Sequence, residues 1–222
     1  MRYQTVLFDL DYTLGDASSG ILTCFRHVLS EMNYPLVSDD VLRHTIGNTL
    51  EDSFTIVTGE SAPERRELFC TLYMQKADTV MTHALHLYPQ TLPLLEALQA
   101  AGCRMAVVST RPVRRLEQML QTAGIRSFFH VLIGVDSVTN PKPDPSALLL
   151  AMEHCGAARK GTLYLGDTVI DAEAAKNAGI DFVAVTTGMT PKEMFDDFPT
   201  RLVAEHLGQV KEWMCDEACL RK

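Results

Sequence analysis

The chain has 222 residues, of which 46% are hydrophobic and 22% charged, the balance of an ordinary globular protein. Its formal net charge of −8 and its lack of a basic run exclude a nucleic-acid-binding surface, which needs clustered Lys and Arg. No apolar run approaches the roughly 20 residues of a membrane-spanning helix, and we expect no signal peptide. The expectation is a cytoplasmic protein with reduced cysteines and no nucleic-acid or membrane partner.

Short apolar segments rich in Val, Leu and Ile predict the strands of a sheet. They lack clean alternation, as expected for parallel strands that are covered on both faces. Segments with helical apolar spacing separate them, and a glycine follows each of these as a C-cap signal. We expect strands at 5–10, 103–109, 130–134, 162–166 and 182–186, and helices at 92–101, 114–123, 145–154 and 171–178. This order predicts an α/β fold with a Rossmann-like parallel sheet between helical layers.

The interval 15–86 interrupts this alternation. It has no strand-like run, and its apolar spacing predicts helices at 19–32, 38–43, 50–57 and 62–82. Such an interval is too long for a loop and too regular for disorder. We expect an inserted α-helical cap domain at residues 15–86 and an α/β core formed by residues 1–14 and 87–222. Within the core, the segment 193–222 is expected to be mixed helix, with Trp213 packed on the core.

Polar residues follow the predicted strands where each strand ends. Asp9 and Asp11 follow the first strand, Ser109 ends the second, Lys142 comes after the third, and Asp167 follows the fourth. Ligands of an open parallel sheet bind outside the carboxyl ends of its strands, so these groups are expected to converge. Clustered carboxylates need a cation, and hard oxygen ligands suit Mg²⁺. The set suits phosphoryl transfer, with an aspartate as nucleophile, a second acid for proton transfer, and lysine and hydroxyl groups on the phosphoryl oxygens.

Four motifs in this order resemble those of the haloacid dehalogenase superfamily, most closely its phosphoglycolate phosphatase-like members. They are DxDxT at 9–13, the serine at 109, KPDP at 142–145 and GDxxxD at 166–171. The resemblance covers essentially the whole chain, including a helical cap after the first strand. It implies a magnesium-dependent phosphatase that hydrolyses a small-molecule phosphate monoester through an aspartyl phosphate. Phosphoglycolate is the most natural substrate under this resemblance.

The resemblance also implies which acids hold the metal. Asp9 would be the nucleophile and a magnesium ligand. Asp11 would be the general acid/base and would bind the metal through its backbone carbonyl. Asp167 would ligate magnesium, and Asp171 would orient metal-bound water from the start of a helix.

The remaining site residues are implied to bind substrate. Ser109 and Lys142 would hold the phosphoryl group, together with Thr110, which stands where asparagine is usual and weakens one polar contact. Arg43 comes directly before the stretch HTIGNT, where cap loops of this family approach the substrate. It is therefore the candidate substrate-binding residue of the cap.

Two further positions depart from the family's pattern. Tyr12 stands where glycine is usual, so we expect the turn to avoid glycine-only backbone angles and Tyr12 to project toward the cap. Arg111 replaces a common lysine and is expected to be a surface charge. Neither change removes a catalytic group.

Two other functions compete with the phosphatase. A β-phosphoglucomutase-like phosphoryl transferase shares the core and cap type, but it needs a cap that grips a second phosphate, and no arginine pair for that is evident. A receiver-like phosphoacceptor is a non-hydrolytic module with a similar acid pair, hydroxyl and lysine. The phosphorylated aspartate of such a module follows its third strand, where Asp136 is the nearest acid in this chain. Such modules also have no large insert after the first strand. The phosphatase therefore ranks first.

Overall fold

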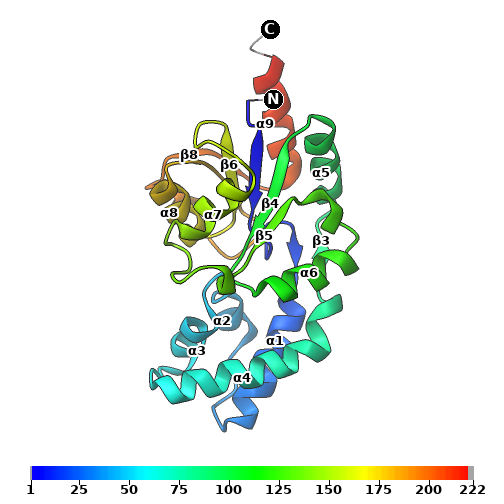
Figure 1. Cartoon of the computed structure of the whole chain (residues 1–222). Helices are drawn as coiled ribbons and strands as arrows, with labels where there is room; N and C mark the ends of the chain where they lie inside the picture. The colour runs from blue at the N-terminus through cyan, green and yellow to red at the C-terminus, as the bar shows by residue number, and fades with distance from the viewer. Residues whose placement is uncertain (1, 220–222) are drawn as a thin grey trace.

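A six-stranded parallel sheet forms the centre of the molecule (Figure 1). The computed structural model describes residues 2–219. The strands lie in the order β5-β4-β1-β6-β7-β8, and all pairings between them are parallel. Their bounds are Thr5–Phe8 (β1), Arg104–Val108 (β4), Val131–Ile133 (β5), Thr162–Gly166 (β6), Asp181–Val185 (β7) and Thr200–Ala204 (β8). Because β4 and β6 flank β1, the carboxyl ends of these three strands meet at one edge of the sheet.

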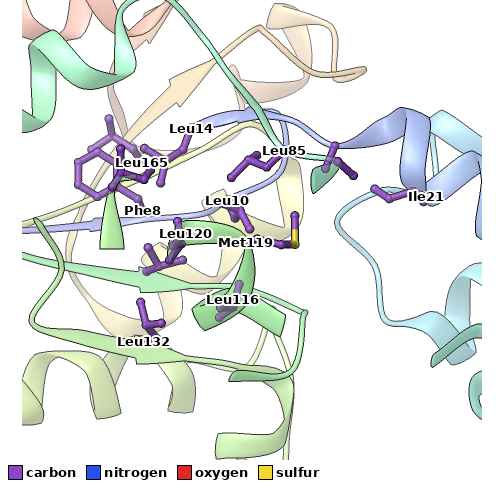
Figure 2. Close-up of a cluster of buried hydrophobic side chains, with 14 of the residues drawn as sticks. Phe8, Leu10, Leu14, Ile21, Leu85, Leu116, Met119, Leu120, Leu132 and Leu165 are labelled. Carbon is purple, nitrogen blue, oxygen red and sulfur yellow. The ribbon is translucent and has the colours of Figure 1, made fainter. Parts of the chain in front are cut away.

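Helices cover both faces of the sheet, so β1 is buried along its whole length. Successive side chains of a strand point to opposite faces: Val6 and Phe8 belong to one apolar cluster and Leu7 to the other. Figure 2 shows Phe8 and Leu165 near Leu120 in the first cluster. Helices α5 (Thr91–Ala100), α6 (Val113–Thr122) and α9 (Leu207–Cys219) contribute to that cluster, whereas α7 (Ser146–His154) and α8 (Val169–Ala178) contribute to the second.

Four helices after β1 form a separate layer, which we call the helical insert (Figure 1). It is held together by aromatic packing, with the rings of Phe54 and Phe69 stacked at 4.6 Å and Phe25 5.3 Å from Tyr73. A two-stranded antiparallel ribbon, Gly15–Asp16 (β2) with His86–Leu87 (β3), brings the two ends of the insert together. The helices are α1 (Ser18–Glu31), α2 (Asp39–Arg43), α3 (Leu50–Thr58) and α4 (Pro63–Val80).

Short 3₁₀ turns complete the connections: η1 (Met81–His83), η2 (Arg126–Phe128), η3 (Val135–Ser137) and η4 (Lys192–Phe195). The lysine-bearing loop between η3 and α7 contains a cis peptide bond between Lys142 and Pro143. None of the helices in residues 2–219 is both long and apolar enough to cross a bilayer.

The predicted α/β fold class is confirmed, and each predicted strand and helix is present with ends shifted by at most two residues. The prediction of mixed helix at 193–222 was wrong for residues 200–204, which form the edge strand β8. The prediction of no strand in the insert missed β2, which at two residues is too short to produce a pattern. Trp213 packs on the core as predicted, 6.0 Å from the ring of Tyr3. The domain boundaries at 15–86, 1–14 and 87–222 stay predictions, and residues 1 and 220–222 lie outside the described residues.

Candidate active site

The carboxyl edge of the sheet gathers the side chains that the motifs singled out. Asp9 follows β1, Ser109 follows β4 and Asp167 follows β6, and all three are buried. The loop before α7 places buried Lys142 beside Asp9, with 2.8 Å between Nζ and Oδ1. The first turn of α8 adds Asp171, whose Oδ1 lies 2.7 Å from the same Nζ. The parallel sheet thus brings together residues as far apart in the chain as Asp9 and Asp171.

Lys142 uses its three N–H donors inside this cluster. Besides Asp9 and Asp171 it donates to the hydroxyl of Tyr164 on β6, at 3.0 Å. Burial on its own lowers the pKa of Lys142, but the charges of Asp171 and Asp9 outweigh it and hold this pKa well above its usual range. Lys142 is therefore a permanent cation. Tyr164 was not predicted, and its only signal in the sequence is a polar hydroxyl in a strand that must be buried.

The three acids Asp9, Asp167 and Asp171 form a compact carboxylate cluster. One oxygen from each lies within 4.8 Å of the others. Burial raises the pKa of Asp9 to about 7, although the charge of Lys142 opposes this. Burial also raises the pKa of Asp167 well above its usual range, and the neighbouring charge of Asp171 adds to the effect. Three carboxylates facing one lysine leave an excess of negative charge, so this set of hard oxygen donors fits a divalent cation such as Mg²⁺.

Asp171 differs from the other two acids because donors already surround it. Its Oδ1 accepts from Lys142 and from Tyr164, and its Oδ2 accepts from the backbone N–H and the hydroxyl of Thr168. Burial opposes ionisation, but Lys142 and these donors lower the pKa of Asp171. These four donors occupy the four lone-pair positions of the Asp171 carboxylate. Asp171 is therefore suited to the predicted role of orienting metal-bound water. Thr168 is the N-cap of α8. The hydrogen bonds between Thr168 and Asp171 therefore cap the helix and also hold the Asp171 carboxylate in place.

Asp11 points to a different partner. Its two carboxylate oxygens accept from Nε and Nη2 of Arg111, at 2.5 Å and 2.9 Å. The side chain of Arg111 is only 12% exposed, so the prediction of a surface charge was wrong. The reason is its position: Arg111 follows Ser109 at the carboxyl edge, where it reaches the loop after β1. Burial lowers the pKa of Arg111, but the charge of Asp11 outweighs it and raises this pKa overall.

The backbone of Tyr12 also departs from expectation. Its φ is +57°, in the left-handed region that costs a non-glycine residue about 1–2 kcal/mol, so the prediction that this turn avoids such angles was wrong. The turn is held by the N–H of Tyr12, which donates to Gly15 O at 2.8 Å, and by the hydroxyl of Thr187, which donates to Tyr12 O. Tyr12 does project toward the insert, as predicted: its hydroxyl accepts from Nη1 of Arg43 at 3.1 Å.

The sequence model of the haloacid dehalogenase-like hydrolases matches residues 6–185. The chain belongs to this family. It is 32% identical over 218 residues to a phosphoglycolate phosphatase of Vibrio parahaemolyticus, covering 93% of this chain and 94% of that one. A phosphoglycolate phosphatase of Vibrio cholerae is 31% identical over 218 residues, covering 93% and 95%.

Solved structures agree with this assignment. A haloacid dehalogenase-like protein from Bacteroides fragilis superposes with a TM-score of 0.91 at 41% identity, covering 94% of this chain and 99% of that one. The predicted family and the predicted enzyme class, a phosphoric monoester hydrolase, are confirmed. The roles of the individual site residues stay predictions.

In this hydrolase a cavity of about 230 Å³ is lined by residues of both the helical insert and the core. The core contributes Asp11, Thr110 and Arg111, and the insert contributes residues of α1, α3, α4 and the loop at 45–49. The cavity is therefore lined in part by the loops that follow β1 and β4, the same loops that carry Asp9 and Ser109. Arg43 is placed next to it rather than in its lining, because its Nη1 is bound to Tyr12 and, at 2.6 Å, to the hydroxyl of Ser18. Its predicted contact with substrate stays a prediction.

Gly188, in the loop after β7, contributes through its lack of a side chain. A Cβ at this position would lie 2.0 Å from Oδ2 of Asp167, so the backbone there passes directly against a carboxylate of the cluster. Sequence reasoning missed this residue, because a glycine after a strand is also an ordinary turn signal. Because Gly188 has no side chain, the carboxylate of Asp167 can occupy this space.

Proposed function

We propose that this protein is a magnesium-dependent phosphatase that hydrolyses a small-molecule phosphate monoester through an aspartyl phosphate on Asp9. The observation that carries the proposal is the arrangement around Asp9. Its Oδ1 is held 2.8 Å from the Nζ of Lys142, and its carboxylate lies within a buried cluster of excess negative charge. A buried carboxylate next to a permanent cation and a cation-binding cluster is suited to attack an anionic phosphate group.

Magnesium would be held by Asp9 and Asp167 and by the backbone carbonyl of Asp11, with Asp171 acting through a bound water. When bound, it supplies positive charge that offsets the carboxylates and the phosphoryl oxygens. The donor set supports this metal because all the side-chain donors are carboxylate oxygens.

The side chains of the protein then divide the chemistry. A carboxylate oxygen of Asp9 forms a bond to phosphorus while the bond from phosphorus to the ester oxygen breaks, and Asp11 gives that leaving oxygen a proton. Asp11 next takes a proton from the water that attacks the aspartyl phosphate, which releases phosphate and restores Asp9. Lys142, Ser109 and Thr110 hold the phosphoryl oxygens through both steps. Arg111 keeps the carboxylate of Asp11 in place.

The phosphoacceptor alternative gains no support from Asp136. This acid is exposed, and its Oδ1 accepts from the backbone N–H of Val113 at 2.9 Å, which satisfies a free donor at the start of α6. A helix-capping role accounts for it. The transferase alternative would require the insert to bind a second phosphate, and no contact observed within residues 2–219 favours it over hydrolysis.

The test is phosphate release from a panel of esters with and without Mg²⁺. The panel contains phosphoglycolate, sugar phosphates, nucleotides and pyrophosphate, and the variants are Asp9→Asn and, as a matched control, Asp136→Asn. We expect metal-dependent release that falls at least about 10³-fold in Asp9→Asn and is unchanged in Asp136→Asn. Activity that survives in Asp9→Asn would overturn the nucleophile. Transfer of phosphate to a sugar phosphate without release would establish the transferase.

A further inference from the structure

The cavity reaches the proposed reacting groups through two residues of the core. Asp11, which would give a proton to the leaving oxygen, and Thr110, which would hold a phosphoryl oxygen, both line it. The leaving oxygen is therefore expected at the core wall of the cavity, and the rest of the alcohol should extend into the space beyond it. Side chains that face this space with free hydrogen-bonding groups are in position to select the alcohol.

Three hydroxyl groups that the insert adds to the lining are already hydrogen-bonded. The hydroxyls of Thr45 and Ser53 donate to backbone carbonyls at 2.8 Å and 3.2 Å, and that of Thr49 donates to Asp52 at 2.7 Å. These bonds hold the loop at 45–49 against the start of α3. Their protons are therefore not available to a ligand.

The hydroxyl of Tyr73 differs from these three. Tyr73 lies on the face of α4 that lines the cavity with Cys70, Met74 and Ala77, and its ring is 5.3 Å from that of Phe25. The residue is only 4% exposed, yet its hydroxyl keeps accessible surface and has no hydrogen-bond partner within residues 2–219. Such groups are rare in folded proteins. The Tyr73 hydroxyl is thus a donor that faces the cavity without a protein acceptor.

Arg111 adds unused donors from the core side of the same cavity. A guanidinium has five N–H groups, and Arg111 gives two of them, on Nε and Nη2, to Asp11. Its Nη1 has no acceptor in the described part of the chain and is not sealed from solvent. Burial raises the pKa of Tyr73, and the charge of Arg111 opposes this rise. The guanidinium and the Tyr73 hydroxyl therefore lie near one another.

Two unused donors at one site favour a ligand that carries an oxygen acceptor. A hydroxyl or carboxylate oxygen on the alcohol would satisfy them, whereas an alkyl group would leave them desolvated and unpaired. A site built to hydrogen-bond its substrate rejects an analogue without the polar group more strongly than it rejects a change of one methylene. Residues with such donors therefore determine specificity.

We propose that Arg111 and Tyr73 determine the specificity of this protein by donating hydrogen bonds to an oxygen acceptor on the leaving alcohol. The substrate class is a phosphate monoester whose alcohol carries a hydroxyl or a carboxylate group. One edge of the Arg111 guanidinium holds Asp11, and Nη1 binds the alcohol. This inference rests on the proposed phosphatase function and adds the residues that select its substrate.

Three esters with the same two-carbon frame test the proposal. Ethyl phosphate has no acceptor on its alcohol, 2-hydroxyethyl phosphate adds a hydroxyl, and phosphoglycolate carries a carboxylate. We expect kcat/KM for at least one of the two acceptor esters to exceed that for ethyl phosphate by about tenfold or more. The better of the two identifies the acceptor. If neither exceeds ethyl phosphate by about tenfold, the proposal is overturned.

Tyr73→Phe removes the hydroxyl and keeps the packing of the ring. It should lower kcat/KM for the preferred acceptor ester about tenfold and that for ethyl phosphate less than about twofold. The matched control is Tyr34→Phe, because the Tyr34 hydroxyl donates to Glu60 at 3.4 Å within the insert and lies outside the lining. It should change both values less than about twofold. An equal loss for both esters in Tyr73→Phe would mean a structural role and would remove Tyr73 from the proposal.

Arg111→Lys separates the two contacts of the guanidinium. Lysine keeps the charge but has no second edge, so all three esters should lose rate through Asp11. The ratio of kcat/KM between the preferred acceptor ester and ethyl phosphate should in addition fall about tenfold. This ratio does not depend on how well Asp11 is oriented. A ratio equal to that of the wild type would show that Arg111 acts on Asp11 alone.

Ligand-detected NMR separates the failure of this inference from the failure of the proposed function. If the esters release phosphate at equal rates, the inference fails and the phosphatase stands. If no ester releases phosphate, the three esters stay intact and their binding is measured directly. Tighter binding of an acceptor ester to the wild type, lost in Tyr73→Phe, would then keep the assignment of the cavity without the phosphatase. Equal binding of all three esters would overturn the assignment as well.

Discussion

Arg111 and Asp11 form a bidentate ion pair between the two loops that follow β4 and β1. Nε and Nη2 of the guanidinium lie 2.5 Å and 2.9 Å from the two carboxylate oxygens. Two parallel hydrogen bonds fix the plane of the carboxylate as well as its position. The acid proposed for proton transfer is thus oriented by a neighbour, and the pair lines the cavity between the helical insert and the core.

Replacing Arg111 with Ala should lower kcat/KM about 10–100-fold, since the carboxylate loses its orientation. The free energy of unfolding should fall by about 3 kcal/mol, because Asp11 is left buried without its partner. Arg111→Lys keeps the charge but not the paired geometry. Its kcat/KM and its free energy of unfolding should therefore lie between those of the wild type and those of Arg111→Ala. The control is Arg114→Ala on α6, whose side chain is 60% exposed. Steady-state kinetics and urea unfolding measure both effects, and unchanged kinetics in Arg111→Ala would contradict a positioning role.

The stability of the metal-free protein should fall as the pH rises. Burial raises the folded-state pKa of Asp9 to about 7 and that of Asp167 well above its usual range, whereas an unfolded Asp titrates near about 3.9. A carboxyl whose pKa is raised by folding contributes stability that is fully present below its unfolded pKa. That contribution is lost as the pH rises through the folded pKa.

The measurement is Tm with a chelator at about pH 5 and about pH 8, and we expect the lower value at the higher pH. Saturating Mg²⁺ should remove the difference, because a cation favours the charged carboxylates. Asp9→Asn should reduce this difference in Tm even without metal. A chelated protein that is more stable at the higher pH would count against the arrangement of the cluster.

Gly188→Ala should weaken magnesium binding. The new Cβ would lie 2.0 Å from Oδ2 of Asp167, so this carboxylate or the loop must move. We expect the apparent affinity for Mg²⁺ to fall about 10-fold or more, the size seen when the surroundings of a ligand are disturbed. Gly102→Ala provides the control, since a Cβ there meets nothing within 4 Å although its φ is +72°. It should lose stability through backbone strain alone and keep its metal affinity.

Arg43→Ala should raise KM and lower Tm together. The guanidinium of Arg43 links α2 of the insert to Tyr12 and Ser18, at 3.1 Å and 2.6 Å, and the substrate is expected between the insert and the core. Losing these hydrogen bonds should cost about 1–2 kcal/mol of unfolding free energy. Tyr12→Phe removes only the acceptor hydroxyl and should show a smaller change. If Arg43→Ala lowers Tm without changing KM, then Arg43 has a structural role only.

Several features of this protein followed from the sequence by itself. The strand at 5–10, the insert after it and the helices of the core were predicted because apolar periodicity reports which face of an element is buried. The acids and lysine of the site were predicted because residues at the ends of parallel strands share one edge. Local signals of this kind missed β8, whose burial is partial at the edge of the sheet.

Only the tertiary structure decided how the site is completed. Arg111 and Asp11 are 100 positions apart, and Gly188 meets Asp167 across a different pair of loops. Tyr12 takes a left-handed angle because Thr187 and Gly15 hold its backbone. The physical reason is common to all three. Sequence periodicity records the burial of a residue within its own element, whereas these contacts depend on how loops from different strands pack at the edge of the sheet.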